Sequence, residues 1–68
     1  MTMYATETAI FRDLFGDPKT VKAHTTEDGR KLVLIKSSTG GSVLTLTPDN
    51  ARQMIEALTA VIAHTMLP

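Results

Sequence analysis

The chain has 68 residues, no cysteine, and seven basic and seven acidic side chains, which give a formal net charge of +0 with neutral histidines. This length predicts a single domain, 1–68, near the size at which only about 60% of the unfolded surface can be buried. Small domains usually add disulfides, a metal or a partner subunit; the lack of cysteine excludes disulfides and thiolate metal sites, so oligomerisation is the expected reinforcement.

The first predicted element is a short helix over residues 6–15. Thr6 can serve as its N-cap, Gly16 suits the position just after its end, and Asp17-Pro18 cannot easily continue it. Its apolar residues form two pairs spaced four apart, Ile10/Leu14 and Phe11/Phe15. A helix of barely three turns must dock its apolar side to persist. Whether it packs on the sheet or beside the C-terminal helix stays open.

Three runs with β character follow, at residues 20–26, 30–37 and 42–47, and predict an antiparallel meander. The first turn, Glu27-Asp28-Gly29, indicates a three-residue loop with Gly29 left-handed. A Thr39-Gly40 turn, or a four-residue loop of the same register, is expected in the second hairpin. Both registers put the same residues on one apolar face: Val21, Ala23, Val33, Ile35, Leu44 and Leu46.

The strongest periodic signal lies in the C-terminal stretch, which predicts a helix over about 48–66. Thr47 is a good N-cap, Pro48 is tolerated in the first turn, and Asp49 places negative charge at the positive end of the helix dipole. One apolar side of this helix is expected to cover the apolar sheet face: Ala51, Met54, Ile55, Leu58, Val61, Ile62, Thr65 and Met66. The predicted fold is therefore a small two-layer α+β domain of order α-β-β-β-α.

Two further surfaces are more apolar or less charged than solvated surfaces usually are. Leu32 and Leu34 lie at the centre of the other sheet face, and either the N-terminal helix or a second subunit is expected to cover them. A stripe of small or uncharged side chains runs along the C-terminal helix and includes Gln53, Ala57, Ala60 and His64. We predict that one of these two surfaces forms a homodimer interface, and the sequence leaves open which one.

The sequence offers no constellation that points to catalysis, a cofactor or a metal. His24 and His64 match no zinc spacing, and no Gly-x-Ser-x-Gly motif is present. The acidic residues fall at helix starts, turns and an exposed helix face, where capping and solvation explain them. We therefore expect no enzyme activity, no cofactor and no metal.

The leading hypothesis is a non-enzymatic protein-binding module, of the kind found among small regulators, inhibitors and bacterial or phage accessory proteins. It is expected to bind itself and another protein, and to be cytoplasmic, because no apolar run approaches the roughly 18 residues that span a bilayer and the N-terminus lacks a signal-peptide pattern.

Nucleic-acid binding is the alternative, and it is less favoured because the net charge is balanced. It would use a modest basic patch on the strands: Lys19, Lys22, Arg30, Lys31 and Lys36. The run from Leu44 to Pro48 is loosely similar to dimeric single-strand-binding proteins in which a final strand passes through a proline into a long helix. The strands lack the base-stacking aromatic residues that such binding usually needs.

Overall fold

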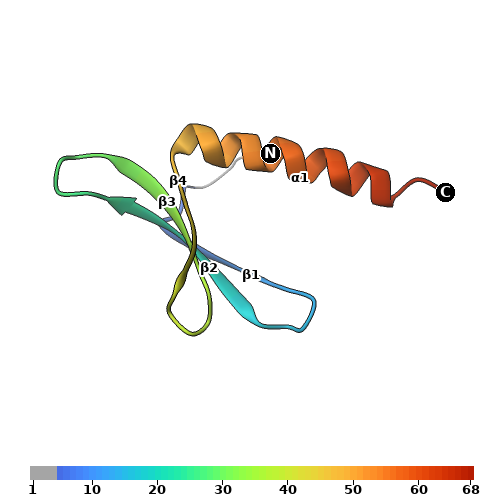
Figure 1. Ribbon diagram of the computed structural model, residues 1–68, viewed down its shortest axis with the longest axis horizontal. Coiled ribbons are helices and arrows are strands. Elements are labelled where there is room, and N and C mark those ends of the chain that lie inside the picture. The colour runs from blue at the N-terminus through green and yellow to red at the C-terminus, as the bar shows by residue number, and fades with distance from the viewer. Residues whose placement is uncertain (1–4) are drawn as a thin grey trace.

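The computed structural model describes residues 5–68 and consists of one antiparallel sheet followed by one helix, an α+β arrangement (Figure 1). The strands pair in the order β1-β2-β3-β4, so each hydrogen-bonds to its neighbour in sequence. The elements are β1 (Thr8–Arg12), β2 (Pro18–Thr25), β3 (Lys31–Lys36), β4 (Ser42–Leu46) and α1 (Pro48–Thr65).

The register of the central hairpin is the predicted one. Val21 pairs with Ile35 and Ala23 with Val33. Gly29 has φ +89°, a left-handed conformation that glycine adopts without steric cost, and it closes a three-residue loop between Thr26 and Arg30. The alternation of apolar residues and the turn chemistry therefore agree on one apolar face.

The second hairpin reaches the predicted register by a different route. Its loop is closed by a hydrogen bond from the Ser37 amide to the Gly41 carbonyl, with Gly40 left-handed at φ +91°. This is a three-residue loop, which alone would shift every following pair by one position. A register shift between Ile35 and Lys36 compensates, so that Ile35 still pairs with Leu44 and both remain on the apolar face.

The predicted N-terminal helix over 6–15 is wrong, and with it the three-stranded meander. Residues Thr8–Arg12 form β1 and pair with β2, so the sheet has four strands. Edge pairing satisfies the backbone of one side of the segment immediately, whereas a three-turn helix depends entirely on docking. Gly16, with φ +82°, belongs to the β1–β2 turn and does not follow a helix end.

Helix α1 begins where the sequence predicts. The Thr47 hydroxyl accepts a hydrogen bond from the Asn50 amide at 3.1 Å, and the Asn50 side chain accepts one from the Thr47 amide at 3.5 Å. This reciprocal pair is a capping box, with asparagine where glutamate or glutamine is more usual. The helix ends one residue before the predicted Met66.

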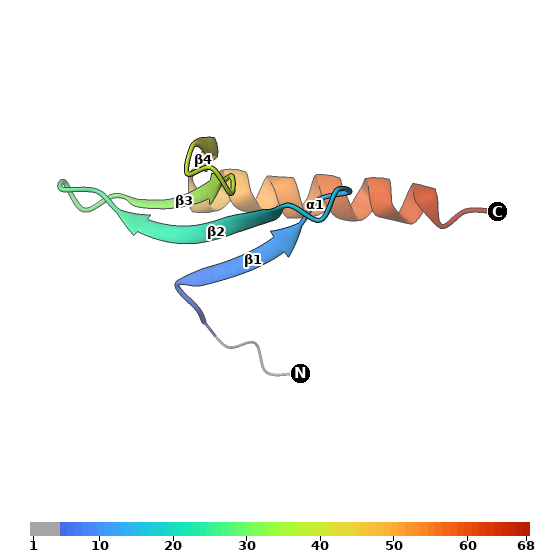
Figure 2. The ribbon, with the colours of Figure 1, turned by 90° about the horizontal axis from the view of Figure 1, so that it is seen from below.

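The helix covers only part of the apolar sheet face. Among the described elements α1 contacts β3 and β4 alone, and its second half extends past the sheet (Figures 1 and 2). None of its residues is buried, and Ile35 is the one buried hydrophobic residue in the described chain, at 6% exposure. The expectation that this helix closes a core of six strand residues is therefore met only around Ile35.

The result is an extended molecule. The radius of gyration is 13.8 Å, whereas a compact chain of this length would have about 11 Å. No helix in residues 5–68 is long and apolar enough to cross a membrane.

Candidate interaction surfaces

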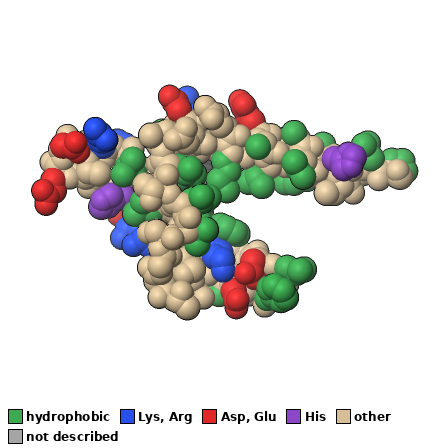
Figure 3. Space-filling view, viewed as in Figure 1, with side chains coloured by type: hydrophobic (Ala, Val, Ile, Leu, Met, Phe, Trp, Pro, Cys, Tyr) green, Lys and Arg blue, Asp and Glu red, His purple; other side chains and the backbone are tan. Residues whose placement is uncertain are grey.

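An apolar groove lies between the sheet and the first half of α1. Its volume is about 530 Å³, and it is open to solvent. Hydrophobic side chains gather along the underside of the helix and the adjoining strands (Figure 3). The lining residues all carry apolar side chains: Phe11, Val21, Val33, Ile35, Leu46, Ala51, Met54, Ile55 and Leu58. In a single chain the apolar lining of this groove is therefore open to solvent.

The second half of α1 continues the apolar side of the groove without any cover. Val61 is 64% exposed and Ile62 is 54% exposed, although both lie on the apolar side of the helix. From Ala57 to the C-terminus the sequence contains no Asp, Glu, Lys or Arg. A solvated helix normally carries charge on its exposed surface, so this half of the helix has the composition of a buried element.

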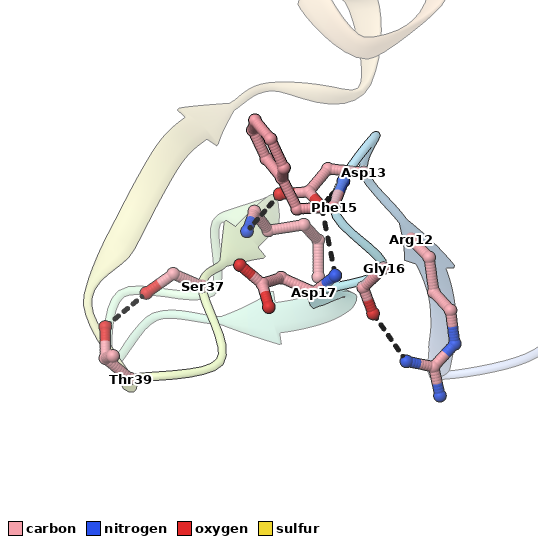
Figure 4. A network of polar contacts seen from close by, with 8 residues as sticks. Arg12, Asp13, Phe15, Gly16, Asp17, Ser37 and Thr39 are labelled. Atoms are coloured by element: carbon pink, nitrogen blue, oxygen red, sulfur yellow. Dashed lines mark hydrogen bonds and ion pairs between the residues drawn. The ribbon is translucent and has the colours of Figure 1, made fainter.

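The β1–β2 turn forms a third apolar feature, and a polar network organises it (Figure 4). One carboxylate oxygen of Asp13 accepts hydrogen bonds from the Phe15 and Asp17 amides, at 2.9 and 3.0 Å. Its other oxygen accepts one from Lys19 Nζ at 3.2 Å, and Arg12 donates to the Gly16 carbonyl at 2.7 Å. The turn is thus held by its own side chains.

Two large apolar residues stand at the tip of this ordered turn. Leu14 is 92% exposed and Phe15 is 85% exposed. The turn points in the same direction as the free half of α1, and the two are separated by an open gap (Figures 1 and 3). The helix, the sheet and this tip therefore form three sides of one open cleft, which is apolar along the helix and at the tip and carries the Lys19–Asp13 ion pair near the base of the turn.

The stability of the folded β1–β2 turn should depend on pH. Partial desolvation favours the neutral form of Asp13, but the hydrogen bonds from Asp17, Lys19 and Phe15 outweigh it, and the pKa of this carboxyl lies below its ordinary value of 3.8. A depressed pKa stabilises the folded turn above the ordinary value, and this stabilisation is lost as pH falls through the folded-state pKa.

We therefore expect the Phe15 and Asp17 amide NMR resonances to titrate together, with a midpoint below 3.8. In Asp13→Asn that transition should disappear, while the amides of the Glu27-Asp28-Gly29 turn should still respond to acid. That second turn is an internal control, because a hydrogen bond from the Thr26 hydroxyl also lowers the pKa of Asp28. A midpoint at or above 3.8 would contradict the assignment.

The outer sheet face, which points away from α1, carries a different set of side chains. Register places Leu32 and Leu34 on it, and both are half-buried without help from any other layer. Its other members are mostly polar or basic: Thr8, Ile10, Arg12, Pro18, Thr20, Lys22, His24, Lys36 and Thr45. None of these strand positions is acidic.

The predicted basic patch is divided by the strand register. Lys22 and Lys36 lie together on the outer face, and Arg12, which was not predicted, lies on the same face. Lys19 pairs with Asp13, and Arg30 lies 3.4 Å from Asp28. Lys31 lies opposite Thr25, on the face that α1 covers in part. The free positive charge is therefore smaller and more localised than expected.

The predicted interface residues also fall on two separate surfaces. Leu32 and Leu34 belong to the outer face, while Gln53, Ala57, Ala60 and His64 form an exposed stripe on α1. Neither histidine lines the apolar groove. Among residues 5–68, no three His, Asp or Glu side chains come together as a group that could hold a metal.

No protein-family model, curated protein or solved structure matches this chain. Sequence reasoning assigned the apolar helix side to an intramolecular core, and it missed both the groove and the Leu14–Phe15 tip. The lack of charge after Glu56 was the available signal. It indicates that this part of the helix needs a cover which a sheet of five- to eight-residue strands cannot supply.

Proposed function

We propose that this chain is a non-enzymatic protein-binding module, a small homodimeric regulator, inhibitor or accessory protein that acts by docking a preformed surface onto another protein. The observation that carries the proposal is the placement of its apolar side chains. They line an open groove and an uncharged half-helix, with no convergent polar groups of the kind that orient a substrate.

Dimerisation and partner binding would use opposite sides of the sheet. The groove side supports self-association because its apolar surface is continuous from the sheet to the end of α1. The outer face stays accessible in such a dimer. It combines exposed Ile10, at 66%, with the cations of Arg12, Lys22 and Lys36, and none of its strand positions is acidic.

This composition favours a protein partner whose contact surface is apolar with acidic residues at its rim. Complementary charge would guide the encounter, and the apolar centre would supply most of the affinity. The two central leucines, Leu32 and Leu34, fit such a centre because they are only half-buried.

Affinity capture from the native host tests the proposal when wild-type and variant baits are compared. Ile10→Asp places a negative charge on the outer face at an exposed position and should abolish recovery of the partner. Thr39→Asp adds the same charge at the exposed tip of the β3–β4 loop and should leave recovery unchanged. A partner retained equally by Ile10→Asp, or repeated recovery of no protein, contradicts the proposal.

Nucleic-acid binding is the second candidate, favoured by one observation, the presence of Arg12, Lys22 and Lys36 on a face without acidic strand residues. No aromatic residue accompanies them for base stacking. Fluorescence titration with single- and double-stranded oligonucleotides at low salt distinguishes the two. Binding that weakens steeply with salt and is lost in Lys22→Glu/Lys36→Glu would favour this candidate over the protein partner.

A further inference from the structure

We propose that the apolar groove of each chain is filled by the second half of helix α1 from a second copy, which lies antiparallel to the resident helix, and that the Leu14–Phe15 tip closes over it. The dyad then passes near Leu58. This inference rests on the homodimer of the proposed function and specifies which surfaces meet and in which direction.

The chain carries both halves of a self-complementary contact. The groove is open beside the first half of α1, up to Leu58. The second half, from Leu58 onward, is apolar, uncharged and uncovered. In an isologous dimer the same surface patch serves both subunits, so each free half-helix can enter the groove of the other chain.

The exposed area matches what such a dimer needs. The chain exposes 5929 Å², whereas a compact monomer of this mass exposes about 4,200 Å². Even if residues 1–4 contributed the roughly 800 Å² of a fully extended tetrapeptide, an excess of about 1,000 Å² remains. A stable interface of standard size buries about 800 Å² per partner, so one symmetric contact accounts for the excess.

The direction of the second helix follows from the positions of its apolar residues. These run from Ala51 to Met66 on one side of the helix, and their midpoint lies next to Leu58. An antiparallel pair centred there places Ile55 of one chain opposite Ile62 of the other. A parallel pair would instead leave both uncovered half-helices side by side and both grooves empty.

The β1–β2 turn supplies the remaining wall. Its tip lies across the open gap from the helix (Figure 3), and the Asp13 network holds the turn in place. A helix that enters the cleft would have the resident helix on one side and the tip on the other. Leu14 and Phe15, which are 92% and 85% exposed, would then be covered.

Disulfide trapping tests the direction, and the absence of native cysteine removes any background. Facing Cα atoms of two packed helices come within about 4 to 6 Å, which a disulfide can bridge. In the antiparallel pair, Ile55 lies about 10 Å along the axis from its own symmetry mate, which is beyond disulfide reach.

The Ile55→Cys and Ile62→Cys variants are mixed and oxidised, with one of them carrying a mass tag. The yield of the mixed disulfide dimer should be at least tenfold higher than the yield of the disulfide dimer that either variant forms when it is oxidised by itself. Gln53→Cys and Ala60→Cys are the matched control, because they have the same seven-residue spacing about 160° around α1 from Ile55 and Ile62, and they should give no mixed product. Efficient self-pairing of Ile55→Cys would indicate a parallel dimer and overturn the inference.

The tip is tested by sedimentation equilibrium. Leu14→Ser/Phe15→Ser should raise the dimer dissociation constant at least tenfold, whereas Ile10→Ser, an exposed apolar position on the outer face, should leave it unchanged. An unchanged constant in the double variant would overturn the closing role of the tip. A wild-type monomer would overturn the homodimer itself, and a dimer without the mixed disulfide would overturn only the arrangement proposed here.

Discussion

Replacing Leu58 with aspartate should convert the dimer into monomers at concentrations where the wild type is fully associated. Leu58 lines the groove and is 51% exposed in a single chain. In the dimer the two copies of residue 58 meet near the dyad, where two carboxylates would lose water and repel each other. An unpaired buried charge costs several kcal/mol, so the dissociation constant should rise by about two orders of magnitude or more.

Light scattering coupled to size-exclusion chromatography measures this change, and Ala60→Asp is the matched control. It places the same charge two residues further on, at an exposed position on the side of α1 away from the groove, and should leave the dimer intact. A Leu58→Asp protein that still elutes as a dimer would show that association uses another surface, such as the Gln53, Ala57, Ala60 and His64 stripe.

Truncating Ile35 to alanine should produce the largest loss of folding stability among single changes in the sheet. Ile35 is buried at the centre of β3, between Val21 on β2 and Leu44 on β4. Shortening a buried isoleucine typically costs about 2–5 kcal/mol. A domain of this length has a total free energy of unfolding of roughly 3–10 kcal/mol, so the loss is a large fraction of the whole.

Urea denaturation followed by circular dichroism measures the loss in free energy of unfolding, and each variant is measured at the same protein concentration. Ile10→Ala removes the same atoms from the outer face, where the side chain is 66% exposed, and should cost less than about 1 kcal/mol. Equal losses in the two variants would mean that the outer face is as well covered as the groove face, which contradicts the description of the core.

The parts of the fold that were predictable are those fixed by local chemistry. The Thr47 cap and the apolar spacing after it define α1, and Gly29 with the alternation of β2 and β3 defines the central register. The bulge at Ile35/Lys36 was not predicted, yet the pairing beyond it was, because the apolar face constrains the register more strongly than the loop does.

The first strand was not predictable from its own residues. Ile10 and Phe11 lie on opposite faces of β1, so the segment is apolar on both sides and shows no clear two-residue alternation. The four-residue spacing to Leu14 and Phe15 then resembles a helix. What decides for the strand is pairing with β2, a tertiary contact, together with Asp13, whose side chain organises the turn.

The sequence predicted that the candidate site is an apolar surface, but it did not predict where that surface lies. The sequence indicated apolar surface in excess of what one small chain can bury, and it assigned that surface to Leu32, Leu34 and the alanine stripe. The groove depends on the angle at which α1 leaves β4 through Thr47 and Pro48, and no residue pattern specifies that angle. The sequence pattern of an apolar helix side is the same whether the sheet of its own chain or a second chain covers it.

If the uncharged half of α1 is covered only in the proposed dimer, the resistance of the protein to proteolysis should depend on its cellular concentration. An isolated helix of about ten residues is unstable in water, so in the proposed dimer the part of α1 beyond the sheet would depend on the second chain for its order. At cellular concentrations below the dimer dissociation constant, newly made chains would present a frayed apolar end to proteases. Doubling the gene dosage would then more than double the steady-state amount of protein, and a modest drop in expression would remove it from the cell.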